Sequence, residues 1–158
     1  MKLRITLLVA LVTLLLLPLT GCKRDFKEFS FSYSMESVSN YKVMVMFDSD
    51  KNYRLEKYNY YMDNFAKKRD PKIYDGKLSD EEFEVLKPIL RDCGLFSMED
   101  SYGFEEGSKS TDIVYQISFT ADGREKFISI RGGSHKFPSS FYELIDFINE
   151  FLKTHHNE

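Results

Sequence analysis

The stretch IVYQISFTADGREKFISIR, residues 113–131, decides the fold class of this chain. Apolar and polar side chains alternate on both sides of Asp122-Gly123, a dipeptide that favours the two-residue turns of β-hairpins. The stretch therefore predicts two antiparallel strands, IVYQISFT and EKFISIR, joined by a tight turn.

The segment before this hairpin, KLSDEEFEVLKPILRDCGLF (77–96), predicts a helix. Ser79 and Glu82 fit a capping box, and Gly94 favours the end of the helix. Apolar residues recur every three or four positions, as one buried helical stripe requires: Phe83, Leu86, Leu90, Cys93. Pro88 lacks an N–H group and predicts a kink or a break.

The segment after the hairpin predicts a second helix that starts at Pro138-Ser139-Ser140. Ser140 with Glu143 fits another capping box. The expected buried face of this helix is Phe141, Leu144, Ile145, Ile148 and Leu152, widened by Phe147 and Phe151.

Upstream of both helices the sequence predicts strands. Alternation begins at Phe29, and the runs YKVMVMF (41–47) and YRLEKYNYYM (53–62) are rich in β-formers, with a further short strand at 72–74. The predicted order is strands, helix, hairpin, helix. This order indicates a single α+β domain over 29–154, an antiparallel sheet of about five strands with two helices packed on one face. Residues 155–158 are expected to be a tail.

Composition limits the function classes. The chain has 158 residues, is 42% hydrophobic and contains 14 Phe and 10 Tyr, which is typical of one globular domain. A net charge of -3 gives no basic face, so we expect no nucleic-acid partner. Two cysteines give no disulfide framework.

The N-terminus has the pattern of a secretory signal. Lys2 and Arg4 precede an apolar run from Ile5 to Leu17, which matches the length of a signal-peptide core. A membrane-spanning helix needs about 20 apolar residues, so a span is the weaker interpretation. We expect residues 1–21 to be a signal peptide and 22–28 a short charged tether.

Leu19-Thr20-Gly21-Cys22 resembles the lipobox of bacterial lipoproteins. The resemblance implies lipidation of Cys22 and cleavage before it, and two or more acyl chains would anchor the protein stably in a bilayer. An ordinary secretory signal is the alternative. Lys23 at the second mature position resembles the default for outer-membrane sorting. The expected location is therefore the bacterial envelope, in the outer membrane, facing either the periplasm or the cell surface.

The three core segments, KLSDEEFEVLKPILRDCGLF, TDIVYQISFTADGREKFISI and FPSSFYELIDFINEFL, resemble the uncharacterised small α+β domains of bacterial lipoproteins. Because the function of those domains is unknown, the resemblance supplies no catalytic residues.

A cluster of tyrosines is the main candidate interaction surface. Alternation along the strand puts Tyr58 and Tyr60 on one face, and Tyr53 and Tyr61 on the other. Both faces cannot be equally buried in a two-layer fold, so some of these rings are expected to bind a protein or a glycan. The alternative is that their hydroxyls simply reach solvent at the rim of the sheet.

Other candidate sites are weaker. Arg131, Gly132, Gly133 and Lys136 precede a helix and suggest an anion site, although a flexible connection explains the glycines equally well. Asp48-Ser49-Asp50-Lys51-Asn52 begins like a calcium loop but is better explained as a turn. The histidines, His135, His155 and His156, are expected to be solvated, and Cys93 to be a buried thiol. We predict no metal site and no cofactor.

The leading hypothesis is a lipid-anchored binding domain with an envelope protein or glycan as partner. One alternative is an envelope hydrolase that uses acidic residues, namely Glu99, Asp100, Glu105, Glu106 and Asp112. Another is a structural accessory of an envelope assembly.

Overall fold

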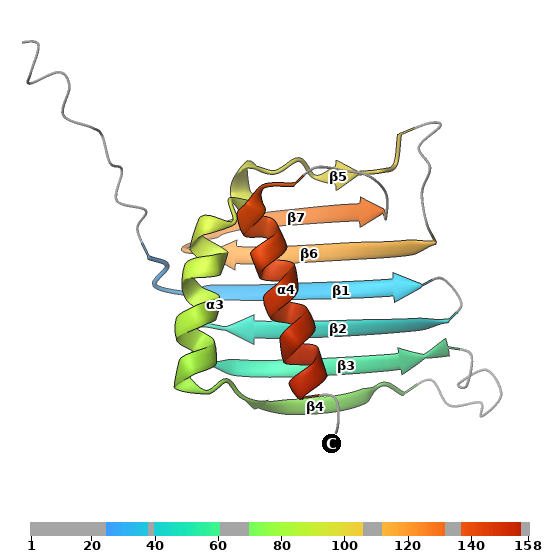
Figure 1. Cartoon of the computed structure of the whole chain (residues 1–158), viewed down its shortest axis with the longest axis horizontal. Coiled ribbons are helices and arrows are strands. Elements are labelled where there is room, and N and C mark those ends of the chain that lie inside the picture. The colour runs from blue at the N-terminus through green and yellow to red at the C-terminus, as the bar shows by residue number, and fades with distance from the viewer. Residues whose placement is uncertain (1–24, 38–39, 61–69, 106–111, 132–136, 156–158) are drawn as a thin grey trace, which may run out of the picture.

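The computed structural model describes residues 25–37, 40–60, 70–105, 112–131 and 137–155. A seven-stranded sheet carries both helices on one face (Figure 1). The elements in chain order are β1 (Phe29–Ser37), β2 (Tyr41–Asp48), β3 (Asn52–Asn59), β4 (Lys72–Lys77), α3 (Asp80–Asp92), η1 (Leu95–Ser97), β5 (Ser101–Tyr102), β6 (Ile113–Ala121), β7 (Arg124–Arg131) and α4 (Ser139–Thr154). Within these ranges, none of the helices combines the length and apolar character needed to cross a membrane.

The strand order is β4-β3-β2-β1-β6-β7-β5, with β1 at the centre. All neighbouring pairs are antiparallel except β5 and β7, which are parallel. The α+β class and the helices on one face agree with the sequence prediction, but the sheet has seven strands and is mixed. β5 was not predicted from the sequence, because two residues are too few for alternation to appear.

Local turn chemistry agrees with the sequence. Asp122 and Gly123 have φ values of 47° and 77°, the two positive angles of a type I′ hairpin turn. Between β2 and β3, the Asp48 carboxylate accepts hydrogen bonds from the backbone N–H groups of Asp50 and Asn52, both at 2.9 Å. Asp48 therefore caps a turn, and no metal-binding group of His, Cys, Asp and Glu occurs among the residues described.

Helix α3 begins with the predicted capping box. Ser79 accepts a bond from the Glu82 N–H at 3.1 Å, and the Ser79 N–H donates to the Glu82 carboxylate at 2.7 Å. Gly94, with φ 70°, follows the C-cap. Of the kink or break predicted at Pro88, the break is wrong, because one helix runs through this residue. The carbonyl that Pro88 leaves unbonded belongs to Glu84, an exposed position that water can reach.

Helix α4 differs from the prediction at its start. Pro138 occupies the N-cap, and no side chain caps the helix, so the expected Ser140–Glu143 capping box is wrong. Ser140 lies inside the first turn, where its hydroxyl is not placed to accept the bond that a cap receives. At the other end His155 is not a solvated tail residue. Its ring stacks on Phe151 at 4.1 Å between ring centroids.

The core lies between the sheet and the two helices. Alternate residues of the central strands point into it, and each helix contributes one stripe. The largest fully buried side chains are Phe31, Phe47, Phe119, Leu55, Leu86, Leu90, Leu95, Ile117, Ile128, Leu144, Ile148 and Val45. The opposite face of the sheet, called the open face below, carries neither α3 nor α4 (Figure 1).

Residues 25–28, expected to be part of a tether, are docked on the domain instead. Asp25 pairs with Arg91 at 2.8 Å, and the Phe26 ring lies 5.2 Å from that of Phe119. The backbone N–H groups of Lys27 and Glu28 donate to the Asp122 carboxylate. An apolar contact and three polar ones therefore hold this segment to the body of the protein.

Candidate functional site

A groove runs beside α4 on the helix side of the sheet. Helix α4 crosses the strands obliquely, and β1, β6 and β7 extend beyond it (Figure 1). The flank of the helix and the exposed ends of these strands enclose about 310 Å³. This volume is within the lower range of small-molecule pockets in proteins.

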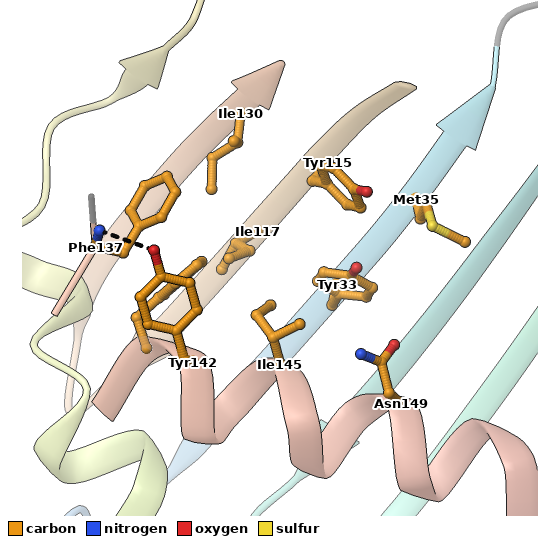
Figure 2. A pocket seen from close by; sticks show the side chains of 10 residues that line it. Tyr33, Met35, Tyr115, Ile117, Ile130, Phe137, Tyr142, Ile145 and Asn149 are labelled. Carbon is orange, nitrogen blue, oxygen red and sulfur yellow. Dashed lines mark hydrogen bonds between the residues drawn. The ribbon is translucent and has the colours of Figure 1, made fainter. Parts of the chain in front are cut away.

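The groove has an apolar body. Figure 2 shows Phe137 and Tyr142 at one end, Tyr33, Tyr115, Met35 and Asn149 at the other, and isoleucines between. The ten lining residues are Tyr33, Met35, Tyr115, Ile117, Ile130, Phe137, Phe141, Tyr142, Ile145 and Asn149. None of these ten side chains is a carboxylate, an amine or a guanidinium, so the lining carries no charge at neutral pH.

Tyr33 is the most unusual residue of the lining. It is only 3% exposed, yet its hydroxyl has no hydrogen-bond partner among the described residues. The rings of Tyr33 and Tyr115 are 6.2 Å apart, and the Tyr115 hydroxyl likewise has no partner in the described part of the chain. Neither hydroxyl oxygen is among the buried side-chain atoms that lack a partner in the described residues, so both open into the groove, where water can bond to them. The groove thus contains two polar groups whose hydrogen bonds the protein does not supply.

The protonation state of Tyr33 is set by its burial. Desolvation raises the pKa of Tyr33 well above its usual value, and the nearby phenols of Tyr115 and Tyr41 raise it further. Tyr33 is therefore neutral at physiological pH and retains its O–H as a donor.

The aromatic end of the groove is held in place by its own contacts. The Phe137 ring packs 4.8 Å from Phe141 and 5.0 Å from Tyr102, and the Phe137 N–H donates to the Tyr142 hydroxyl at 3.4 Å. The two ends of the groove therefore differ: one is fixed by internal bonds, and the other presents unpartnered phenols.

The described tyrosines of the candidate interaction surface lie on two faces of the sheet, as the alternation along the strand predicted. Tyr53 packs on the helix side, 5.1 Å from Phe151, and a Cβ at Gly76 on the neighbouring strand would meet its ring at 2.5 Å. Tyr58 and Tyr60 lie on the open face with their rings 6.1 Å apart. Tyr61 is outside the described residues.

The hydroxyls on the open face are satisfied by carboxylates. Tyr58 donates to Glu56 at 2.9 Å, and Tyr60 donates to Glu36 at 3.3 Å. Glu56 is 8% exposed and also accepts from Arg54 Nε at 2.8 Å. The hydrogen bond from Arg54 lowers the pKa of Glu56, with a smaller contribution from Tyr58, so this carboxylate is ionised at neutral pH.

The predicted anion site is described only at Arg131. Its guanidinium lies over the Phe104 ring at 4.8 Å, and its Nε is buried without a hydrogen-bond partner in the described part of the structure. The other residues of the predicted anion site, Gly132, Gly133 and Lys136, fall outside the described residues. The geometry of that site is therefore not described.

The acids considered for hydrolysis lie at exposed positions. Glu99, Asp100, Glu105 and Asp112 are exposed, none of them lines the groove, and Glu106 is outside the described residues. Asp100 pairs with Lys126 at 2.5 Å.

Cys93 agrees with the sequence prediction. It is fully buried, and its thiol donates to the Leu90 carbonyl. Its setting is that of a structural thiol.

Sequence reasoning assigned the strands that line the groove but missed the groove itself. The alternation of β1 and β6 already places Tyr33, Met35, Tyr115 and Ile117 on one face. Two phenols on a face expected to be buried were a signal, since each hydroxyl needs a partner.

No protein-family model matches the chain, and comparison with curated proteins finds no relative.

Proposed function

We propose that this chain is a lipid-anchored protein of the bacterial envelope whose domain binds a small ligand in the groove beside α4. The observation that carries the proposal is the Tyr33 hydroxyl, which opens into an uncharged groove and has no partner among the described residues. A binding role agrees with this arrangement, because apolar pockets with a few convergent polar groups are the usual form of ligand sites.

The docked N-terminal segment, residues 25–28, supports a particular orientation of the domain relative to the bilayer. Only residues 23 and 24 lie between a lipidated Cys22 and Asp25, a reach of at most about 11 Å. Phe29 begins β1 at the tethered end of the sheet, whereas Tyr33 and Met35 lie farther along this strand. In this orientation the groove is on the part of the domain farther from the bilayer, and a ligand reaches it from the aqueous compartment.

A hydrolase is a less favoured function for this domain. The hydrolase considered from the sequence would use acidic residues, which requires a cleft with paired carboxylates, one as acid and one as base or nucleophile. The acids Glu99, Asp100, Glu105 and Asp112 are each exposed, and the groove lining contains none of them.

Site-specific photo-crosslinking in cells tests the binding role. A benzophenone amino acid at Ile145, in the groove, is compared with one at Phe127, which is 54% exposed on the open face. We expect mass spectrometry to find a small-molecule adduct at position 145 and none at position 127. Equal adducts at both positions, or none at position 145, would contradict the proposal.

The anchor has a separate test. Cys22→Ala should abolish fatty-acid labelling and leave the precursor uncleaved, while Cys93→Ala, which removes the buried thiol, should retain labelling. Undiminished labelling of Cys22→Ala would exclude lipidation at this position.

A further inference from the structure

We infer that the groove selects an uncharged, largely apolar ligand that presents a hydrogen-bond acceptor, such as a carbonyl oxygen, to the Tyr33 hydroxyl. This inference rests on the proposed binding role and adds the chemical class of the ligand. Its basis is the combination of an uncharged wall with a hydroxyl that opens into the groove and has no partner in the described structure.

The wall selects against charge. Ile117, Ile130 and Ile145 form the middle of the groove, and none of the ten lining residues carries a counter-charge. An ionised group placed there would lose its hydration without compensation, which is far more costly than burying a neutral polar group. An apolar ligand body gains free energy by leaving water.

The donor selects for an acceptor. Tyr33 is neutral at physiological pH because burial raises its pKa, so the hydroxyl proton is present. The hydroxyls of Tyr58 and Tyr60 on the open face already donate to carboxylates, and those of Tyr33 and Tyr115 do not. A ligand oxygen beside Tyr33 would therefore accept a hydrogen bond that no described protein group takes, and Tyr115 is placed to contribute a second.

The volume limits the size of the ligand. At about 30 Å³ for each water-sized group, the 310 Å³ of the groove holds about ten such groups. A single aromatic ring with a short substituent fills most of this space.

Three small probes of similar shape distinguish these features: acetophenone has the carbonyl, ethylbenzene lacks it, and benzoate is charged. The protein is the mature chain, residues 22–158, carrying Cys22→Ser so that no acyl chain competes with the probes. Isoleucine methyl signals in NMR spectra report the site. Ile117, Ile130 and Ile145 line the groove, whereas Ile73 on the open face is the internal control.

We expect acetophenone to shift the three groove methyls and to bind about fivefold more tightly than ethylbenzene, as one hydrogen bond predicts. Benzoate should bind more weakly than acetophenone by about tenfold or more. Tyr33→Phe should remove the advantage of acetophenone and leave ethylbenzene unchanged. Tyr58→Phe, the matched control on the other face, should alter neither affinity.

The outcomes separate two failures. If no probe shifts the groove methyls more than the Ile73 methyl, the groove is not a binding site and the proposed function fails. If the probes bind there but benzoate binds most tightly, or Tyr33→Phe keeps the acetophenone advantage, the binding role stands and the ligand class inferred here is wrong.

Discussion

On the helix side of the sheet, Tyr33 and Tyr115 line a groove and their hydroxyls have no partner among the described residues, whereas on the open face Tyr58 and Tyr60 donate to Glu56 and Glu36. Tyr33, Tyr115 and Tyr58 lie on strands of one sheet, and Tyr60 directly follows β3. The hydroxyls of the open-face pair are bonded within the protein. Those of the groove pair have no partner among the described residues, although the Tyr33 side chain is only 3% exposed.

This contrast separates structural tyrosines from binding tyrosines. A phenol that donates to a carboxylate contributes to the stability of the fold, and its removal leaves an acceptor unpaired. A phenol whose hydroxyl has no protein partner contributes little to stability through that hydroxyl. Its O–H group is useful only when a ligand accepts the hydrogen bond. Four substitution or titration experiments follow from the contrast.

The largest effect is expected from the apolar wall of the groove. Ile117 is fully buried, and Ile117→Ala should lower the free energy of unfolding by about 2–4 kcal/mol through lost burial and a cavity. Ser118, the next residue, is exposed on the open face, and Ser118→Ala should change stability by less than about 0.5 kcal/mol. Urea denaturation measures both. Equal losses would mean that the two faces do not differ in packing.

A smaller effect is expected at the carboxylate of the open face. Glu56→Gln should cost about 1–2 kcal/mol, because it weakens the bonds from Arg54 and Tyr58 to a nearly buried charge. Glu36→Gln is the matched control. Its contacts, 3.3 Å from Tyr60 and 3.6 Å from Lys42, are longer, so the loss should be smaller.

The Glu56 effect should depend on pH. The folded-state pKa of Glu56 lies below its value in the unfolded chain, so the carboxylate stabilises the fold at pH values above the unfolded pKa. This contribution is lost as pH falls through the lowered folded pKa. The stability difference between the wild type and Glu56→Gln should therefore shrink under acidic conditions. A difference that grows with acidity would contradict the assignment.

The smallest effect on the free energy of unfolding at neutral pH is expected from the ionisation of Tyr33. Its folded pKa is raised, so its contribution is fully present below the unfolded tyrosine pKa, about 10, and is lost as pH rises above that value. Wild type should lose stability above about pH 10 more steeply than Tyr33→Phe, while the two differ little in slope near pH 8. Urea unfolding across this range provides the test, and parallel curves would place the Tyr33 phenol in water.

Much of the fold could be predicted because its signals are local. The Asp122-Gly123 turn and the Ser79–Glu82 capping box each depend on residues a few positions apart. The α3 stripe likewise follows from spacing alone. These features gave the α+β class and the order of its main elements.

The remaining features depend on contacts that are distant in sequence. The two residues of β5 become a strand only because β7 pairs with them, and α4 starts at Ser139 because Pro138 takes the cap position. Docking of Asp25 depends on Arg91, distant in the chain.

The groove is also a long-range feature. The alternation of β1 and β6 shows which residues share a face, but the path of α4 across that face decides which of them stay uncovered (Figure 1). Tyr33 and Tyr115 therefore appeared as ordinary core positions. Tyr58 in β3 and Tyr60 just after it looked more suggestive in the sequence, but their hydroxyls are bonded to carboxylates of the protein itself.

Paired measurement of the free energy of unfolding for Tyr33→Phe and Tyr58→Phe tests the central claim most directly. Each substitution removes one hydroxyl and keeps the ring, so packing is preserved. We expect Tyr33→Phe to be as stable as wild type or more stable, since its hydroxyl has no partner among the described residues, and Tyr58→Phe to lose about 1 kcal/mol with its bond to Glu56. A loss in Tyr33→Phe equal to or greater than that in Tyr58→Phe would show that the fold itself uses the Tyr33 hydroxyl, and would contradict a role for it in binding.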